Sequence, residues 1–335
     1  MRSGGGTTLN ARIGYRVNNR MRLELEGFNL LDRRDAAISY FYASRLKGES
    51  ETRDDVHFHP LKPRNFRAAA IVNGRPSSAG GREKWYACRM TYVEPPYTDP
   101  ARLQAALKDD GYAVLRPADV CALAGCSEAD LAALAASWDN LELDNYLKDA
   151  GRYRRRRHSC FIQDGAGLAQ APHRAHWQPV EYNALHGGMH RLFAPVEPGT
   201  VGQAGWQRLL RSLGDVCSEV AGTHRWYVEA HQFRIDTLEG IGRPTPEGAH
   251  RDGVDFVAVL LVGRSHIKGG ETRVFDADGP NGQRFTMLEP WTLLLLDDAR
   301  VIHESTPIQP DGANGHRDTL VLTWRADGFQ GEQAS

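Results

Sequence analysis

The sequence predicts an α+β protein that is mainly β, with a sandwich or jelly roll preceded by helices. Two observations support this fold class. From Arg225 onward, short alternating or apolar segments are separated by clusters of glycine, proline, aspartate and asparagine. Between residues 100 and 220, apolar residues recur instead at helical spacing.

The first 75 residues show the alternation of polar and apolar residues that is typical of strands. Residues 10–17 and 22–26 alternate in this way on either side of the turn-like pair Asn18 and Asn19, which predicts a hairpin. Phe66–Val72 is a third candidate strand. We therefore expect a strand-like or partly disordered extension before the main domain.

A glycine- and serine-rich stretch follows this extension, from Asn73 to Arg82. Such a composition is typical of a flexible linker. The sequence therefore predicts three regions, which are an extension at 1–75, a linker at 76–89 and a main domain at 90–335.

The main domain begins with predicted helices at Pro100–Asp110, Ser127–Trp138 and Gly205–Val220. Ser127 is the expected N-cap of the second helix, and a strand is expected at Tyr112–Leu115. Six further strands are predicted after the helices, at Tyr227–Ile235, Asp255–Val262, Thr272–Phe275, Gln283–Leu288, Thr292–Leu296 and Thr319–Trp324.

The composition of the 335 residues argues against several partners. The formal net charge is −1, which gives no electrostatic reason to expect nucleic acid or an anionic membrane as a partner. No apolar run approaches the about 20 residues of a membrane span, and the N-terminus lacks the apolar core of a secretory signal. Five cysteines without a CxxC pair do not indicate a disulfide framework. We expect a cytoplasmic protein.

Two imidazoles and a carboxylate form the strongest chemical motif. His250 and Asp252 are two positions apart in a segment expected to be extended, so their side chains point the same way. His303 follows the predicted apolar strand Thr292–Leu296. Such a set occupies one face of an octahedral ion and leaves three positions open, as in non-haem Fe(II) oxygenases. The alternative is that the two histidines are separately hydrogen-bonded.

Arg317 and Thr319 follow on the last predicted strand and share one of its faces. A buried arginine beside a metal needs an anion, and its planar guanidinium fits a carboxylate bidentately. We therefore expect the two residues to bind one carboxylate of a co-substrate.

Substrate recognition is predicted less sharply. A free amino acid needs one group that binds its carboxylate and another that binds its ammonium. The candidates are Arg157, Gln232 and Arg234 for the carboxylate, and Glu247 or Glu271 for the ammonium. For each of these residues an ordinary structural or surface ion pair is an equal alternative. In the run Arg154–Arg157 we expect a solvated face with one buried anchor. We expect a structural role for His176, and no motif supports a functional role for His231.

The segments Gly242–Val257 and Gly269–Thr272 resemble the bacterial 2-oxoglutarate/Fe(II) dioxygenase family that contains the isoleucine 4-hydroxylases. The similarity extends over residues 95–328 and includes Tyr153–Arg157 and Gly187–Arg191. It implies a double-stranded β-helix, with iron held by the two histidines and the aspartate and with Arg317 binding the distal carboxylate of 2-oxoglutarate. It also implies O2 as co-substrate and hydroxylation of an unactivated C–H bond in a free aliphatic amino acid.

The first 75 residues resemble a different family. Asn29–Asp32, Tyr40–Leu46 and His57–Arg64 are similar to the last strands of TonB-dependent outer-membrane receptors. Because a few strands cannot close a barrel in a membrane, we interpret this region as a fragment without receptor function.

Two other function classes compete with the dioxygenase. A non-catalytic, cupin-type metal-binding protein would share the metal residues, but it has no need for Arg317 and Thr319 at this spacing. An outer-membrane transport protein is supported by residues 1–75 alone.

Overall fold

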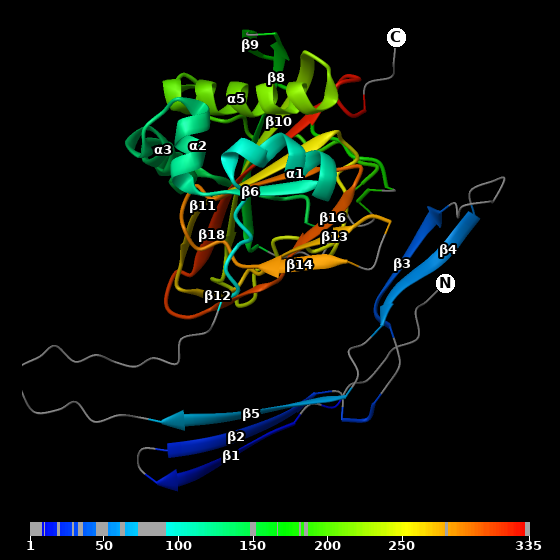
Figure 1. Ribbon diagram of the computed structural model, residues 1–335, viewed down its shortest axis with the longest axis vertical. Helices are drawn as coiled ribbons and strands as arrows, with labels where there is room; N and C mark the ends of the chain where they lie inside the picture. Colours follow the sequence, from blue (N-terminus) through cyan, green and yellow to red (C-terminus); the bar gives the residue numbers. More distant parts are fainter. Residues whose placement is uncertain are drawn as a thin grey trace, which may run out of the picture. The chain divides into compact units, whose positions relative to one another are not determined.

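The computed structural model describes residues 9, 11–18, 21–28, 30–32, 36–44, 53–60, 64–72, 92–147, 152–165, 167–180, 182–183, 187–278 and 281–331. The chain divides into two compact units, Met1–Thr91 and Tyr92–Ser335 (Figure 1). The predicted linker at 76–89 lies outside the described residues.

The described part of the first unit is built from antiparallel strands. β2 (Met21–Phe28) pairs with β1 (Ala11–Asn18) on one side and with β5 (Asn65–Val72) on the other. β3 (Ala36–Ser44) and β4 (Arg53–Pro60) form a separate hairpin. The predicted hairpin and third strand are therefore present, while the similarity to receptor strands stays a prediction.

The second unit is a jelly roll whose larger sheet has eight strands. The path β6-β15-β11-β18-β10-β8-β7 is antiparallel throughout, and β9 pairs with the outer part of β8. In this order the strands are β6 (Tyr112–Leu115), β15 (Leu293–Asp297), β11 (Phe256–Ser265), β18 (His316–Arg325), β10 (Arg225–Asp236), β8 (Arg154–Asp164), β7 (Glu142–Leu143) and β9 (Gly167–Gln170).

The opposite wall of the jelly roll is formed by shorter strands. β13 (Thr272–Asp276) lies between β14 (Gly282–Phe285) and β16 (Val301–Ser305). β12 (Ile267–Gly269) and β17 (Ile308–Pro310) form a two-stranded ribbon. An apolar cluster that includes Val257, Leu294 and Phe285 fills the space between the two walls at one end.

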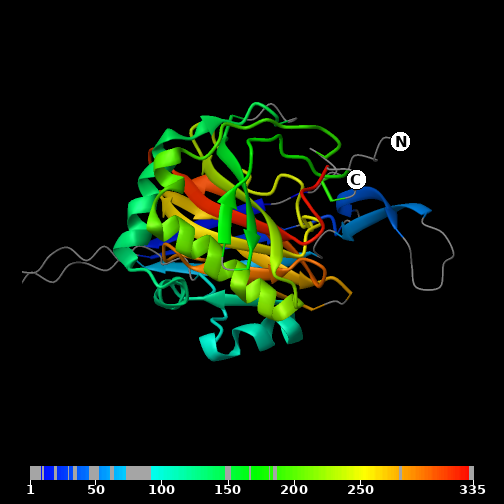
Figure 2. The same ribbon diagram turned by 90° about the horizontal axis from the view of Figure 1, so that it is seen from above.

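Helices cover the outer face of the large sheet (Figures 1 and 2). The longest is α5, an amphipathic helix whose apolar side packs on the sheet. In chain order the helices are η1 (Pro100–Arg102), α1 (Leu103–Asp110), α2 (Pro117–Ala124), α3 (Glu128–Ala135), η2 (Ala136–Asn140), α4 (Pro198–Val201) and α5 (Ala204–Ala221).

Local signals explain where two of the helices begin and end. Ser127 caps α3 as predicted, because its hydroxyl accepts from the backbone N–H of Asp130 while the Asp130 carboxylate accepts from the Ser127 N–H. α1 ends at Gly111, which has φ = 77°. A side chain there would also lie 2.8 Å from Val301 Cγ1, so this position requires glycine.

Strict alternation along the central strands separates the core from the functional face. On β10, Trp226, Val228 and Ala230 face the helices, while Glu229 and His231 line a cavity on the other face. β18 follows the same rule, with Leu320, Leu322 and Trp324 in the core and Arg317, Thr319 and Val321 at the cavity. The sheet thus presents polar groups on one face because its other face is buried under the helices.

Trp138 fixes the helical layer to the two strands that carry most of this functional face. It is 1 % exposed, and its indole Nε1–H donates to the backbone oxygens of Phe233 on β10 at 3.1 Å and of Thr319 on β18 at 3.3 Å. A buried tryptophan of this kind adds apolar burial of about 2–3 kcal/mol and satisfies its own polar atom.

The structure confirms the predicted fold class and corrects some of its elements. The stretch 154–170, expected in the helical half, forms the strands β8 and β9. The short strands β12, β16 and β17 were not predicted, because three to five residues give too few alternations to recognise. Among the described helices none alone has the length and apolarity of a membrane span, and one bent pair, Pro117–Ala124 with Glu128–Asn140, meets the requirement on length and composition alone.

Candidate active site

His250, Asp252 and His303, called the metal triad below, meet at the mouth of the jelly roll as predicted. His303 lies on β16, and His250 lies in the loop before β11. The two backbones form an isolated bridge in which each N–H donates to the other's carbonyl at 3.0 Å. This bridge holds the two imidazole rings with their centroids 4.6 Å apart.

The donor atoms of the triad surround one point. His250 Nε2 lies 3.9 Å from Asp252 Oδ1, and His303 Nε2 lies 3.8 Å from Asp252 Oδ2. All the ligand atoms lie within 4.8 Å of one another. A single cation between them can therefore contact both imidazoles and the carboxylate and keep open positions for other ligands.

The triad offers the donor atoms that metal binding requires. His250 Nδ1 lies 2.9 Å from the Gly248 carbonyl, to which it can only donate, so the Nε2 lone pair remains for a metal. Burial lowers the pKa of His303 well below its ordinary value, so this imidazole is neutral at physiological pH. Burial raises the pKa of Asp252. Although burial disfavours the charged imidazole of His250, the carboxylates of Glu247 and Asp252 raise its pKa. A bound cation would favour the neutral imidazole and the ionised carboxylate. The residues present therefore fit a divalent cation.

Asp298 shapes the loop that carries Asp252. Its carboxylate accepts from the backbone N–H groups of Asp252 at 3.0 Å, Gly253 at 2.8 Å and Val254 at 3.2 Å. Gly253 has φ = 74°, and a side chain there would collide with the ring of Tyr182. The loop therefore depends on a glycine at 253 and on a buried acid beneath it.

Arg317 provides a site for an anion in the same cavity. Its side chain, on β18, is 4 % exposed, and its Nη2 has no hydrogen-bond partner. Burial lowers the pKa of Arg317 to about 10, so the guanidinium remains charged at neutral pH. Thr319 lies two residues further along the same face and is also buried. An unpaired buried guanidinium fits the distal carboxylate of a dicarboxylate co-substrate such as 2-oxoglutarate.

Three further arginines, Arg154, Arg156 and Arg191, line the cavity and are called the arginine wall below. Each is at most 5 % exposed. Arg154 is neutralised by Asp144, whose Oδ2 lies 2.8 Å from its Nε. The Nε atoms of Arg156 and Arg191 have no hydrogen-bond partner.

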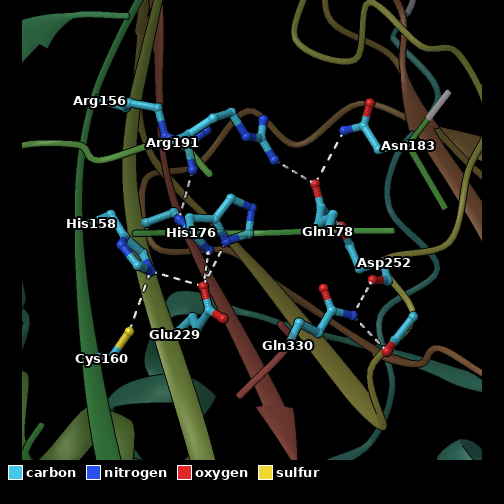
Figure 3. Close-up of polar contacts among 12 residues, drawn as sticks. Arg156, His158, Cys160, His176, Gln178, Asn183, Arg191, Glu229, Asp252 and Gln330 are labelled. Carbon is cyan, nitrogen blue, oxygen red and sulfur yellow. Dashed lines mark hydrogen bonds and ion pairs between the residues drawn. The ribbon is translucent and has the colours of Figure 1, made fainter. Parts of the chain in front are cut away.

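A second group of possible ligands, His158, His176, Glu229 and His231, is called the histidine cluster below. Glu229 Oε2 lies 2.8 Å from His158 Nε2 and 2.7 Å from His176 Nδ1 (Figure 3). Arg156 Nη2 lies 2.8 Å from His231 Nδ1. Burial lowers the pKa of His176 to about 4, so this histidine is neutral.

The structure places the five predicted substrate residues differently. Glu247 lines the cavity; its Oε1 lies 3.8 Å from His250 Nε2, and its Oε2 is buried without a partner. The other four point away from the cavity and already have protein partners. Arg157 donates to the carbonyls of Asn140 and Pro195, Gln232 to Ser137, and Arg234 to Asp318, while Glu271 accepts from Arg273.

The corrections at Arg157, Gln232 and Arg234 have one physical cause, which is the phase of a two-residue repeat. On β8 the buried, cavity-lining arginines are Arg154 and Arg156 rather than Arg157. On β10 the cavity-lining residues are Glu229 and His231 rather than Gln232 and Arg234. The apolar residues at 226, 228 and 230 mark the core face of β10, and this signal would have assigned Glu229 and His231 to the cavity.

Comparisons with known proteins agree with this geometry. The family model described as 2OG-Fe dioxygenase matches residues 135–323. A BsmA homologue from Methylobium petroleophilum, of known crystal structure, is 50 % identical, with a TM-score of 0.68 over 72 % of this chain and 98 % of that one. No curated protein sequence matches.

Two more distant structures share the fold. IDO from Bacillus thuringiensis is 19 % identical, with a TM-score of 0.57 over 68 % of this chain and 98 % of that one. The Fe(II)/α-ketoglutarate-dependent dioxygenase TqaL is 22 % identical, with a TM-score of 0.55 over 70 % and 90 %. At these identities the likeness concerns the fold alone.

Proposed function

Because the chain belongs to the 2OG-Fe dioxygenase family, we propose that it hydroxylates an unactivated C–H bond of a free L-amino acid. The protein is a 2-oxoglutarate-dependent dioxygenase that uses Fe(II), 2-oxoglutarate and O2. Membership of this family argues against the alternative of a non-catalytic, cupin-type metal-binding protein. Our proposal concerns the identity of the substrate.

The observation that carries the proposal is that one cavity holds unsatisfied charged groups of opposite sign, two guanidinium groups and one carboxylate. The Nε atoms of Arg156 and Arg191 are buried donors without a partner, and Oε2 of Glu247 is a buried acceptor without one. Unpaired buried polar atoms are costly, about 1–3 kcal/mol each. A substrate carboxylate on the arginines and an ammonium on Glu247 would satisfy all three atoms.

The charges that line the cavity favour a substrate that is neutral overall. Arg154 is compensated by Asp144. The remaining arginines Arg156, Arg191 and Arg317 are balanced in number by three acids, Glu229, Glu247 and Asp252. A divalent cation and a doubly charged 2-oxoglutarate balance each other as well. A zwitterion therefore enters without leaving a net buried charge.

Different residues of the cavity would bind the metal, the co-substrate and the amino acid. The metal triad would hold Fe(II), which supplies the oxidising chemistry when 2-oxoglutarate and O2 are bound. Arg317, with Thr319 beside it, binds the distal carboxylate of the co-substrate. Arg156, Arg191 and Glu247 fix the two charged ends of the amino acid, so its aliphatic part is oriented toward the triad.

The test is succinate release from 2-oxoglutarate across a panel of free L-amino acids, with N-acetyl and amide derivatives of each as matched controls. We expect turnover with free amino acids and a loss of roughly a hundredfold or more when either charged end is blocked. Glu247→Gln should raise KM for the free amino acid and lose the discrimination against the N-acetyl form. Equal turnover of free and blocked compounds, or no turnover with any amino acid, would contradict the proposal.

A further inference from the structure

Gln178 connects the arginine wall to the metal triad through direct hydrogen bonds. Its amide Nε2 donates to Asp252 Oδ1 at 3.1 Å, and its Oε1 accepts from Arg191 Nη2 at 3.0 Å (Figure 3). Asn183 Nδ2 donates to the same Oε1 at 3.1 Å. The amide therefore has its donor side on the metal-binding carboxylate and its acceptor side on the wall.

These contacts leave the Gln178 amide little freedom. Gln178, Asn183 and Arg191 are at most 7 % exposed, so no water competes strongly for the amide. Two donors fix its oxygen, which determines which side of the amide faces Asp252. The backbone is also held, because the Gly188 N–H donates to the Gln178 carbonyl at 2.8 Å and Arg191 forms a backbone bridge with His176.

Arg191 has one side engaged and one side free. Its Nη2 is bound to Gln178, while its Nε is buried and unpartnered. An anion that binds at Nε must share the guanidinium with Gln178. A shift of the Arg191 side chain, or a change in its hydrogen bonding, would then alter the position of Asp252, because the Gln178 amide connects the two side chains by two hydrogen bonds.

We infer that Gln178 is a positioning residue that orients the Asp252 carboxylate for the metal and couples it to the occupancy of Arg191. The anion at Arg191 rests on the proposed function, whereas the coupling from Arg191 through Gln178 to Asp252 does not. In this way a substrate carboxylate bound at Arg191 would alter the orientation of Asp252, one of the three residues that would hold the metal.

The coupling predicts the direction in which metal affinity changes when Arg191 is removed. Arg191 is a cation, so by Coulomb's law alone its removal should strengthen the binding of another cation. If Arg191 instead holds Gln178 in place for Asp252, its removal should weaken metal binding. The sign of the change therefore separates positioning from simple electrostatics.

The experiment is a calorimetric titration of the full chain with Co(II), with the visible absorption of bound Co(II) as a second readout. Gln178→Leu should weaken Co(II) affinity about tenfold or more, the scale known for groups that orient metal ligands. Arg191→Met should weaken it about twofold to thirtyfold, and Arg191→Lys should restore part of the loss. Both weakened variants should show the same altered Co(II) spectrum.

Two matched variants control for folding and charge. Gln178→Glu keeps the shape and the acceptor for Arg191 but removes the donor to Asp252. Its added negative charge should by Coulomb's law alone strengthen Co(II) binding, so weaker binding with a changed spectrum and a preserved fold again has the sign that positioning predicts. Arg156→Met removes an equal charge from the same wall without touching Gln178 (Figure 3), so its Co(II) affinity should stay equal or rise.

Unchanged or tighter Co(II) binding by Arg191→Met, or a wild-type affinity and spectrum for Gln178→Glu, would overturn the inference. Because no amino acid enters this titration, its result is independent of the amino-acid panel. If no amino acid supports turnover but the Co(II) affinities change as predicted, the proposed substrate is wrong and the coupling stands. If an amino acid supports turnover but the Co(II) affinities do not change as predicted, only the coupling is wrong.

Discussion

The metal triad and the histidine cluster offer nearly the same chemistry to the same cavity. Each brings imidazoles and a carboxylate within 4.8 Å, and each is largely buried. They differ in how their hydrogen-bonding atoms are used. In the triad, His250 Nε2 and His303 Nε2 remain directed at Asp252 without hydrogen bonds, whereas the cluster is already joined by short contacts.

The cluster is a hydrogen-bonded network in its present form. Glu229 Oε2 is shared by His158 and His176, and Arg156 occupies the Nδ1 lone pair of His231. An arginine that donates there leaves the His231 proton on Nε2, the atom a metal would need. The rings of His158 and His231 are also stacked with an interplanar angle of 16°. The comparison shows that suitable ligand residues lying close together do not suffice for a metal site. Their ligand atoms must also be free of protons and of hydrogen bonds to other groups.

The largest expected effect is on turnover. Asp252→Ala removes one triad ligand, and succinate formation should fall roughly a thousandfold or more, because several kcal/mol of transition-state stabilisation depend on the bound metal. Glu229→Gln, the corresponding change in the histidine cluster, should retain metal-dependent turnover when assayed below its unfolding temperature. If the two variants lose turnover equally, the distinction between the clusters fails.

The second effect concerns 2-oxoglutarate. Arg317→Met leaves the distal carboxylate of the co-substrate without its cation, and we expect the Kd for 2-oxoglutarate to rise roughly a hundredfold, because a buried charge-assisted pair contributes about 2–5 kcal/mol. Anaerobic titration with the metal present measures it. Arg264→Met, on neighbouring β11 and outside the cavity lining, is the control. An unchanged Kd in Arg317→Met would place the co-substrate elsewhere.

The third effect separates stability from metal binding. Glu229→Gln should lower the free energy of unfolding of the metal-free protein by about 1–3 kcal/mol, because a buried carboxylate that satisfies two imidazoles is lost. Asp252→Asn is nearly isosteric in the triad, and it should leave the stability of the metal-free protein unchanged or slightly raised. Urea denaturation of both variants measures this difference in the free energy of unfolding. A loss of stability in Asp252→Asn but not in Glu229→Gln would contradict the prediction.

The histidine cluster also predicts a pH dependence of stability. Burial lowers the pKa of His176 to about 4 and lowers the pKa of His158 and of His231 too. In the unfolded chain these histidines titrate near 6.5, so the unfolded state binds more protons at acid pH. Their contribution is fully present above about pH 6.5 and is lost as the pH falls toward 4, by up to about 1.4 kcal/mol per pH unit for each histidine.

Denaturation of the metal-free protein at pH 7.5, 6.5 and 5.5 measures this loss. His176→Gln should reduce the slope of the free energy of unfolding against pH between pH 6 and 5, because about one proton fewer is taken up on unfolding. His224 is exposed, and His224→Gln serves as the control. A stability that rises as the pH falls through 6 would show that the cluster is protonated in the folded state.

The smallest effect is expected from the region that contributes to neither cluster. We propose that the unit ending at Thr91 is dispensable for catalysis, because the family match at 135–323 and both clusters lie beyond it. Deletion of residues 1–91 should therefore change the Kd for 2-oxoglutarate less than twofold. Loss of folding on truncation would show that the extension supports the main domain.

Much of the metal site could be predicted from the sequence because its ligands lie in a local motif. His250 and Asp252 are two residues apart, and His303, Arg317 and Thr319 follow later in the chain in a known order, on β16 and β18. The central strands could be predicted equally well. The continuous apolar run of β11 reflects burial on both faces, and the apolar residues at every second position of β18 reflect burial on the helix side.

The arginine wall and the histidine cluster could not be predicted in the same way. They join β8 and β10 to His176 and Arg191, which are placed by the tertiary fold rather than by a local pattern. A run of four arginines also carries no information on which pair faces inward. That phase is decided by the pairing of β8 with β10, where Arg156 lies opposite Phe233 and Arg154 opposite Ile235.

The most direct test of the central claim is the number of metal ions bound per chain, counted by elemental analysis after anaerobic loading with Fe(II) and removal of free metal. The account predicts one ion in the wild type and in Glu229→Gln, and none in Asp252→Ala. Two ions in the wild type, or an ion that survives Asp252→Ala and is lost from Glu229→Gln, would contradict it.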